Sequence, residues 1–193
     1  METCIFSMKI NGKVEGVKKF IDIMETDCRV DWEASKGVSN MKYVCHGDSD
    51  RYFWHLDNLY FSDIEDVGNG MVSVRIRGEC SYSVYCCMFE GESTYYEFYK
   101  GSNGTTLVNE SKNLDLDIEV FSSEPVYEFM EHYLIKKGTL LVKDVIDYCE
   151  YWLDDYDDVD ELNKICGTNF TQEDWDNADE FISIGGIEWH FSI

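Results

Sequence analysis

Carboxylates are concentrated in one stretch of the chain, from Asp144 to Glu180, which contains fourteen Asp and Glu residues but a single basic residue, Lys164. The stretch carries a formal net charge of −13, out of −23 for the whole chain of 193 residues. Ionised carboxylates accept charge-assisted hydrogen bonds from Arg and Lys, as phosphate oxygens do. On a folded surface they make a field that repels nucleic acid and attracts basic surfaces, including the clefts in which other proteins hold nucleic acid.

The same stretch contains apolar residues at helical spacing, which predicts that it folds. These residues are Val145, Ile146, Cys149, Trp152, Leu153 and Tyr156. The predicted helix begins near Asp144, whose carboxylate can cap it. Residues three and four positions apart lie on one face of a helix. One acidic face is therefore expected, and its members are Asp147, Glu150, Asp154 and Asp158.

The acids of this face, their acidic neighbours and two aromatic residues form the candidate partner-binding site. They are Asp147, Glu150, Trp152, Asp154, Asp155, Tyr156, Asp157, Asp158, Asp160 and Glu161. The aromatic residues are included because binding energy at interfaces concentrates in Trp, Tyr and Arg. The alternative interpretation is a solvated face that only keeps an acidic protein in solution.

Other reactive residues form weaker patterns. The run Cys45–Asp48 with His55 lacks the second Cys pair that a zinc site at this spacing would need, so no metal or cofactor is expected. Glu124, Glu131 and His132 could supply the carboxylates or the base of a hydrolase, and this remains an alternative. Nucleophile elbows, P-loops and dinucleotide-binding glycine motifs are absent from the sequence, so the protein is predicted not to be an enzyme.

Eight cysteines are scattered along the chain without a C-x-x-C pair, which predicts reduced thiols rather than a disulfide scaffold. The sequence has no run of 18 apolar residues, so no membrane span is predicted. Its first residues lack the basic start and apolar core of a signal peptide. A cytoplasmic protein that contacts neither membrane nor nucleic acid directly is expected.

The remaining periodicity predicts an α+β fold with an antiparallel sheet of at least five strands and the amphipathic helix Val14–Met24 packed on one face. Strands are predicted at Cys4–Ile10, Arg51–Ser62, Met71–Cys80, Leu114–Phe121, Glu128–Ile135 and Thr139–Val142. The alternation in Leu114–Phe121 predicts a half-buried strand with an acidic outer face. A short helix capped by Thr105 or Thr106 and a helix start at Thr171–Asp174 are predicted. The segments Phe181–Ile184 and Ile187–Ile193 are predicted to form a tight hairpin.

Two stretches resemble a known group of proteins. They are Cys87–Tyr96, and Leu116–Pro125 followed by Phe129–Tyr133 and Gly138. They are similar to uncharacterised proteins of Firmicutes and their mobile elements, and the order of elements resembles that of YubB-like ferredoxin-like domains. The resemblance implies a ferredoxin-like core over residues 1–142, with helices on one face of the sheet. Residues 143–193 would add the acidic helical segment and C-terminal hairpin, packed on the same domain. The resemblance implies no catalytic residues.

The hypothesis that these observations favour is a non-enzymatic inhibitor of host defence, encoded by a phage or mobile element and similar in action to anti-CRISPR proteins. Its acidic surface would occupy the nucleic-acid-binding cleft of an effector such as a CRISPR nuclease. Occurrence on mobile elements supports this only by association. A housekeeping protein–protein interaction module of the same fold is the second hypothesis. The sequence does not indicate an oligomeric state.

Overall fold

The computed structural model describes residues 3–27, 42–44, 56–81, 83–89, 105–124 and 128–193. The strands of this part of the chain are β1 (Thr3–Lys13), β2 (Lys42–Val44), β3 (Leu56–Phe61), β4 (Glu65–Gly68), β5 (Met71–Ser81), β6 (Asp117–Glu124), β7 (Phe129–Lys136), β8 (Thr139–Trp152) and β9 (Phe181–Gly185). The helices are α1 (Val14–Asp27), α2 (Val84–Met88), α3 (Leu107–Asn113), the 3-10 turn η2 (Leu153–Asp155), α4 (Val159–Cys166) and α5 (Gln172–Asn177). None of these helices has the length and apolarity that a membrane crossing requires.

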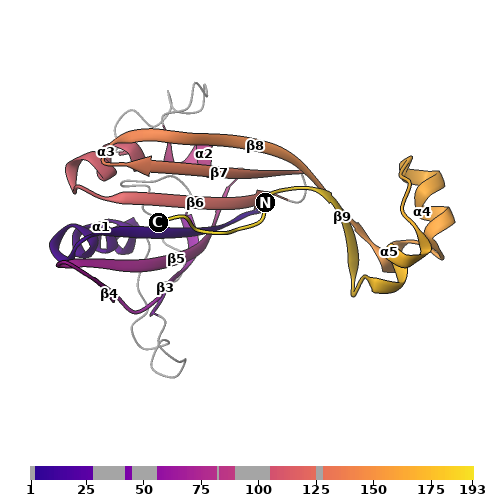
Figure 1. Cartoon of the computed structure of the whole chain (residues 1–193), viewed down its shortest axis with the longest axis horizontal. Coiled ribbons are helices and arrows are strands. Elements are labelled where there is room, and N and C mark those ends of the chain that lie inside the picture. The colour runs from indigo at the N-terminus through magenta and orange to yellow at the C-terminus, as the bar shows by residue number, and fades with distance from the viewer. Residues whose placement is uncertain (1–2, 28–41, 45–55, 82, 90–104, 125–127) are drawn as a thin grey trace.

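The described strands pair antiparallel throughout and join into one sheet (Figure 1). Their order across the sheet is β2-β3-β5-β1-β6-β7-β8-β9, and β4 pairs with β5. The prediction of an α+β protein with an antiparallel sheet of at least five strands is confirmed. Strand β1 lies near the middle of the sheet, between β5 and β6, although it comes first in the chain.

Strand β1 and helix α1 form as the sequence predicted. The residues of β1 that alternate toward the helix side, Cys4, Phe6, Met8 and Ile10, are fully buried. Helix α1 starts directly after β1 and buries its apolar stripe of Val17, Phe20, Ile21 and Met24 on the same core. Its close approach to the sheet requires a glycine at position 16, because a Cβ there would lie 2.5 Å from the Leu114 carbonyl oxygen.

Helices α2 and α3 cover the same face of the sheet as α1. One core contains Val17 and Phe20 of α1, Val84 and Cys87 of α2, and Leu107 of α3. The predicted cap of α3 is confirmed, because the Thr106 side chain accepts a hydrogen bond from the Asn109 N–H at 3.1 Å. None of these three helices covers the opposite face of the sheet.

The C-terminal segment, residues 187–193, covers part of that opposite face. Figure 1 shows it leaving β9 and returning across the sheet toward β1. The prediction of a hairpin over residues 181–193 is wrong: β9 pairs with β8, and no strand follows it. The acidic outer face predicted for residues 114–121 is correct only at its start, where Asp115 is exposed, because Glu119 and Phe121 are each 1% exposed beneath this segment.

Strand β8 replaces the helix that was predicted to begin near Asp144. A turn at Lys137 and Gly138, both at positive φ (48° and 83°), precedes the strand, which continues to Trp152 where the sequence predicted an end at Val142. Its first half pairs with β7 and its second half with β9. Val, Ile, Tyr, Cys and Trp dominate residues 145–152, and these residue types favour strands over helices. Helix formation starts only at Val159, in α4.

Candidate functional site

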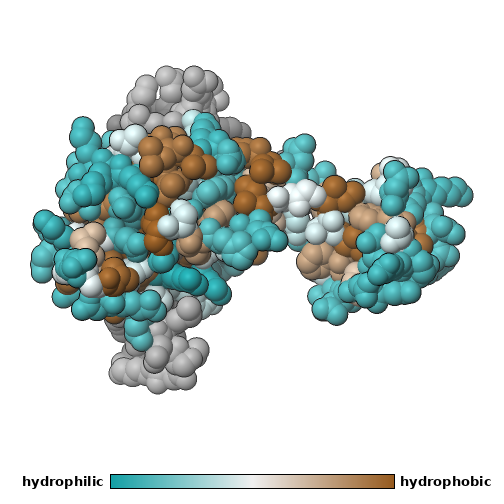
Figure 2. All heavy atoms as spheres, viewed as in Figure 1, coloured by the Kyte–Doolittle hydropathy of each residue, from teal (hydrophilic) through white to brown (hydrophobic). Residues whose placement is uncertain are grey.

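The acidic lobe, defined as residues 148–185, contains the second half of β8, η2, α4, α5 and β9. It projects from one end of the sheet (Figure 1). Its buried residues are Tyr148, Val159, Leu162 and Ile182. The lobe has twelve Asp and Glu residues and one basic residue, Lys164. Figure 2 shows hydrophilic residues over the end of the lobe that points away from the main body.

Three of the acids in the lobe stabilise its helices. The Asp158 carboxylate caps α4 by accepting a hydrogen bond from the Glu161 N–H at 2.9 Å, and the Glu161 carboxylate accepts from the Asp157 N–H at 2.7 Å. In α5 the predicted helix start is confirmed as a capping box between Thr171 and Asp174. The Thr171 N–H and hydroxyl both donate to Asp174, and these hydrogen bonds lower the pKa of its carboxyl group. Part of the negative charge thus has a role in folding.

Most of the other exposed acids of the lobe have no such role. Seven of them make no side-chain hydrogen bond or ion pair with any residue that the structure describes: Asp154, Asp155, Asp157, Asp160, Glu173, Asp179 and Glu180. Their carboxylates point into solvent on a surface held by strands and capped helices. Such a surface keeps its charges at fixed positions, which a disordered acidic tail does not.

The structure distributes the predicted site residues differently from the single helical face that the spacing indicated. Asp147 and Glu150 lie on strand β8, and Asp154 and Asp155 in η2. Asp158, Asp160 and Glu161 begin α4. The structure therefore brings the acids from Asp154 to Glu161 together at the end of the lobe, and leaves Asp147 on the main sheet opposite Phe129. The prediction of one acidic helix face is wrong, because Asp147 and Glu150 lie in a strand and not in a helix.

The two aromatic candidates lie in different environments. Trp152 is 48% exposed and packs on Phe181 with their rings 5.4 Å apart, so it is accessible to a partner. Tyr156 is half-buried, and its hydroxyl lies 3.2 Å from the Cys166 sulfur. That hydrogen bond is the main reason that the pKa of Tyr156 is raised to about 12. Tyr156 is therefore better placed to hold the lobe together than to contact a partner.

The cap on α4 leads to a first prediction. Replacing Asp158 by Ala should destabilise the lobe by about 1 kcal/mol, because the Glu161 N–H at the helix start loses its acceptor. Hydrogen exchange of the α4 amides measures this effect. The matched control is Asp155→Ala, which removes an equal charge from a side chain without a hydrogen bond to a described residue. Equal exchange rates in the two variants would mean that Asp158 acts only through its charge.

The residues considered for hydrolysis lie on both faces of the sheet, with Glu124 and Glu131 on the helix face and His132 on the other. Glu131 and His132 are neighbours on β7, so their side chains point to opposite faces of the sheet. Glu131 is 2% exposed and lies on the helix face. Its carboxylate accepts hydrogen bonds from the Val84 N–H (2.8 Å), the Ser122 hydroxyl (2.7 Å) and the Tyr133 hydroxyl (2.7 Å). Glu124 is also fully buried, at the end of β6.

Glu131 has a structural role as a buried hydrogen-bond acceptor. It holds the start of α2 through the Val84 N–H and links it to β6 and β7. Burial, together with the neighbouring Glu131 carboxylate, raises the pKa of Tyr133, which keeps the phenol protonated as a donor. The Tyr85 N–H is a fourth donor to this carboxylate, at 3.4 Å. A carboxylate that is surrounded by donors and excluded from solvent has no access to a substrate.

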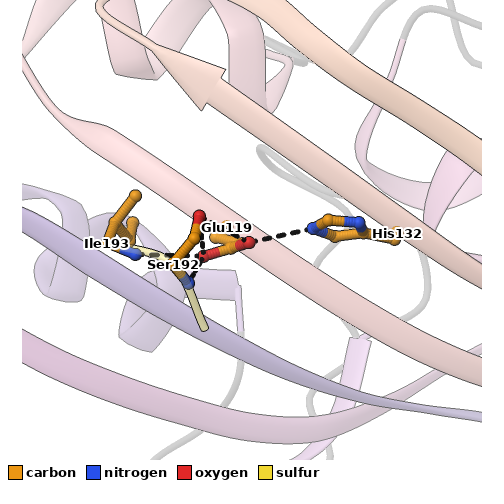
Figure 3. Close-up of polar contacts among 4 residues, drawn as sticks. All are labelled: Glu119, His132, Ser192 and Ile193. Atoms are coloured by element: carbon orange, nitrogen blue, oxygen red, sulfur yellow. Dashed lines mark hydrogen bonds and ion pairs between the residues drawn. The ribbon is translucent and has the colours of Figure 1, made fainter. Parts of the chain in front are cut away.

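His132 belongs to a second buried cluster on the opposite face (Figure 3). Its Nε2 lies 2.9 Å from a carboxylate oxygen of Glu119, and its ring stacks on Phe121 with centroids 4.2 Å apart. Glu119 also accepts hydrogen bonds from the Ser192 N–H and hydroxyl and from the Ile193 N–H. This cluster fixes the C-terminal segment to the sheet across a sequence separation of 73 residues.

Serine, histidine and a carboxylate meet in this cluster, but in an order that does not activate a nucleophile. In a Ser–His–acid triad the imidazole lies between the other two groups and takes the serine proton. Here Glu119 lies in the middle, and both Ser192 and His132 contact it (Figure 3). The Ser192 hydroxyl therefore donates to a carboxylate, which is a structural hydrogen bond.

Among the described residues no group of three or more His, Cys, Asp and Glu side chains is placed to hold a metal ion. The run Cys45–Asp48 and His55 lie outside the described residues. Six cysteines in the described part of the chain are free thiols, and they are Cys4, Cys80, Cys86, Cys87, Cys149 and Cys166. Comparisons with protein-family models, curated proteins and solved structures find no match to the chain.

Proposed function

We propose that the protein is a non-enzymatic binding protein that inserts its acidic lobe into a basic surface of a partner protein. The observation that carries the proposal is the projecting, folded lobe with twelve acids and one lysine, seven of whose acids have no role in holding the described structure. Like charges held close together repel one another, and a basic partner relieves that repulsion. The lobe presents its carboxylates as acceptors for Arg and Lys, in the place of phosphates.

The narrower proposal is that the partner binds nucleic acid and acts in host defence, as a CRISPR nuclease does. The basic clefts of such enzymes are built to hold phosphates at short spacing. The resemblance of residues 87–96 and 116–138 to mobile-element proteins supports this context. In that context the protein would act in the cytoplasm of the host.

A ferredoxin-like core is a further part of the proposal. That fold has the strand order 4-1-3-2 with one helix in each of its two crossovers. Strands β6-β1-β5-β3 lie side by side in this order. Helix α1 follows β1, and α2 and α3 lie between β5 and β6 in the chain. On this reading the additional strands β7, β8 and β9 carry the lobe away from the core.

The experiment removes charge from the lobe without removing a helix cap. The variant Asp154→Asn/Asp155→Asn/Asp157→Asn changes three exposed acids whose side chains form no hydrogen bond or ion pair with a described residue, and it leaves Asp158 in place. The control variant Glu15→Gln/Asp22→Asn/Asp63→Asn removes the same charge from exposed positions on the main body. Both are compared with the wild type for binding to a nuclease captured from a host lysate, and for displacement of its labelled nucleic acid.

The lobe variant should bind about tenfold or more weakly, which corresponds to about 1.4 kcal/mol, because exposed interface charges steer association and pair with arginines. The control variant should bind like the wild type. Wild-type association should also slow clearly as salt is raised, since the Debye length falls to about 8 Å at physiological ionic strength. Equal affinity and equal salt dependence of the two variants would sink the proposal and leave the lobe charge as a solubility feature.

A further inference from the structure

A second, oppositely charged feature lies on the sheet face that the C-terminal segment crosses. There β1 pairs with β5 so that Lys9 lies directly opposite Arg75, and Ser7 opposite Arg77. These side chains form the floor of a cavity of about 310 Å³, and Trp189, His190 and Phe191 of the C-terminal segment form its wall. The chain has 16 Lys and Arg against 39 Asp and Glu, yet three cations meet here without a lining carboxylate.

Two of these cations face each other across neighbouring strands, an arrangement that destabilises a sheet. On its other side Lys9 lies opposite Glu119 of β6, which offsets part of the charge of Lys9. Lys9 also donates a hydrogen bond to the Ile193 backbone oxygen, and the Arg75 guanidinium lies 5.3 Å from the centre of the Phe191 ring. Neither Arg75 nor Arg77 forms an ion pair with any residue in the described part of the chain, so the two guanidinium groups are the cations available to an anion.

Aromatic side chains of the C-terminal segment wall the cavity. Trp189 and Phe191 line it beside the cations. The Trp189 indole Nε1 is itself buried, so the ring contributes its surface to the cavity and its N–H does not.

We infer that this cavity binds a small phosphate-bearing ligand, held by Lys9, Arg75 and Arg77 beside the Trp189 ring. Guanidinium groups match phosphate oxygens bidentately, and lysine adds a compact point charge. An adjoining cavity of about 280 Å³ shares Lys9 and Arg75 and is also lined by Ser62, Ser73 and Glu65. The two together leave room for a ligand larger than inorganic phosphate, in the size range of small-ligand pockets.

The net charge of −23 opposes anion binding, but over a limited distance. At physiological salt, charges more than about 8–10 Å away are largely screened, so the local cations dominate the cavity. The inferred site also shares no residue with the acidic lobe. It is thus independent of the proposed partner binding and extends beyond it.

The test measures binding of inorganic pyrophosphate by titration calorimetry at physiological salt, with sulfate at equal ionic strength as the comparison anion. Wild-type protein should bind pyrophosphate saturably, and the Trp189 indole N–H resonance should shift during the titration. The variant Arg75→Gln/Arg77→Gln should bind about tenfold or more weakly, because it loses both guanidinium contacts. The matched control Lys18→Gln/Lys19→Gln removes two exposed cations from α1, and should bind like the wild type.

Three outcomes would overturn the inference. The first is absence of saturable pyrophosphate binding by the wild type. The second is equal binding of pyrophosphate and sulfate with an unmoved Trp189 resonance, which would indicate an adventitious ion only. The third is equal loss of affinity in the arginine and lysine variants, which would indicate a general charge effect. The lobe variant Asp154→Asn/Asp155→Asn/Asp157→Asn should retain pyrophosphate binding whether or not it binds a partner.

Discussion

Replacing Glu131 by Ala is expected to lower the free energy of unfolding by about 3–5 kcal/mol, the cost typical of removing one member of a buried charged network. The Val84 N–H and the Ser122 and Tyr133 hydroxyls lose their acceptor at once in a region that water does not reach. Each buried donor left without a partner costs about 1–3 kcal/mol. Because whole domains are stable by only about 5–15 kcal/mol, a large part of the native stability is at stake.

Chemical denaturation followed by far-ultraviolet circular dichroism measures the effect. Asp63→Ala, an exposed change in the loop between β3 and β4, is the control and should alter stability little. Glu131→Gln should give an intermediate loss, because the amide keeps one acceptor oxygen but brings two donors into a site that already has only donors. If Glu131→Ala loses less than about 1 kcal/mol, water must enter and satisfy the donors, and Glu131 is then not the anchor of α2.

Local sequence pattern predicts an element correctly where its formation depends on residues close together in the chain. The helical stripe of α1 correctly predicted which of its residues are buried. The caps at Thr106 and Thr171 were also predictable, since a cap depends on residues only three positions apart. These elements need no information about distant parts of the chain.

Strand β8 shows where local pattern is ambiguous. Apolar residues from Val145 to Trp152 satisfy a helical template, but they are also strand-forming types. The segment is a strand because it pairs with β7 over its first half and with β9 over its second half. Strand β9 comes about thirty residues later in the chain. The sequence therefore indicated an exposed acidic surface, but its geometry depended on tertiary contacts.

Burial of Glu119 could not be predicted from alternation. The pattern in β6 correctly placed Ile118 and Val120 on the helix face, and it placed Glu119 and Phe121 on the other. It could not show that a segment ending at Ile193 covers that second face. The pairing of Lys9 with Arg75 is likewise a property of strand register, which the separate patterns of β1 and β5 do not reveal.

Replacing Glu119 by Ala is expected to release the C-terminal segment from the sheet. The Ser192 N–H and hydroxyl and the Ile193 N–H lose their shared acceptor, and His132 loses its partner. The expected loss is about 2–3 kcal/mol, because several donors are orphaned while the aromatic packing on Phe121 remains. Hydrogen exchange at the Ser192 and Ile193 amides should become about 30- to 100-fold faster, since each 1.4 kcal/mol corresponds to about tenfold.

The control for this change is Glu188→Gln, which alters an exposed acid of the same segment whose side chain pairs only with His190 among the described residues. Its exchange rates should match those of the wild type. Release of the segment would also remove Trp189 and Phe191 from the wall of the basic cavity, so Glu119→Ala should weaken pyrophosphate binding although Lys9, Arg75 and Arg77 are intact. Unchanged exchange at Ser192 would mean that aromatic packing alone holds the segment, and pyrophosphate affinity should then be unchanged as well.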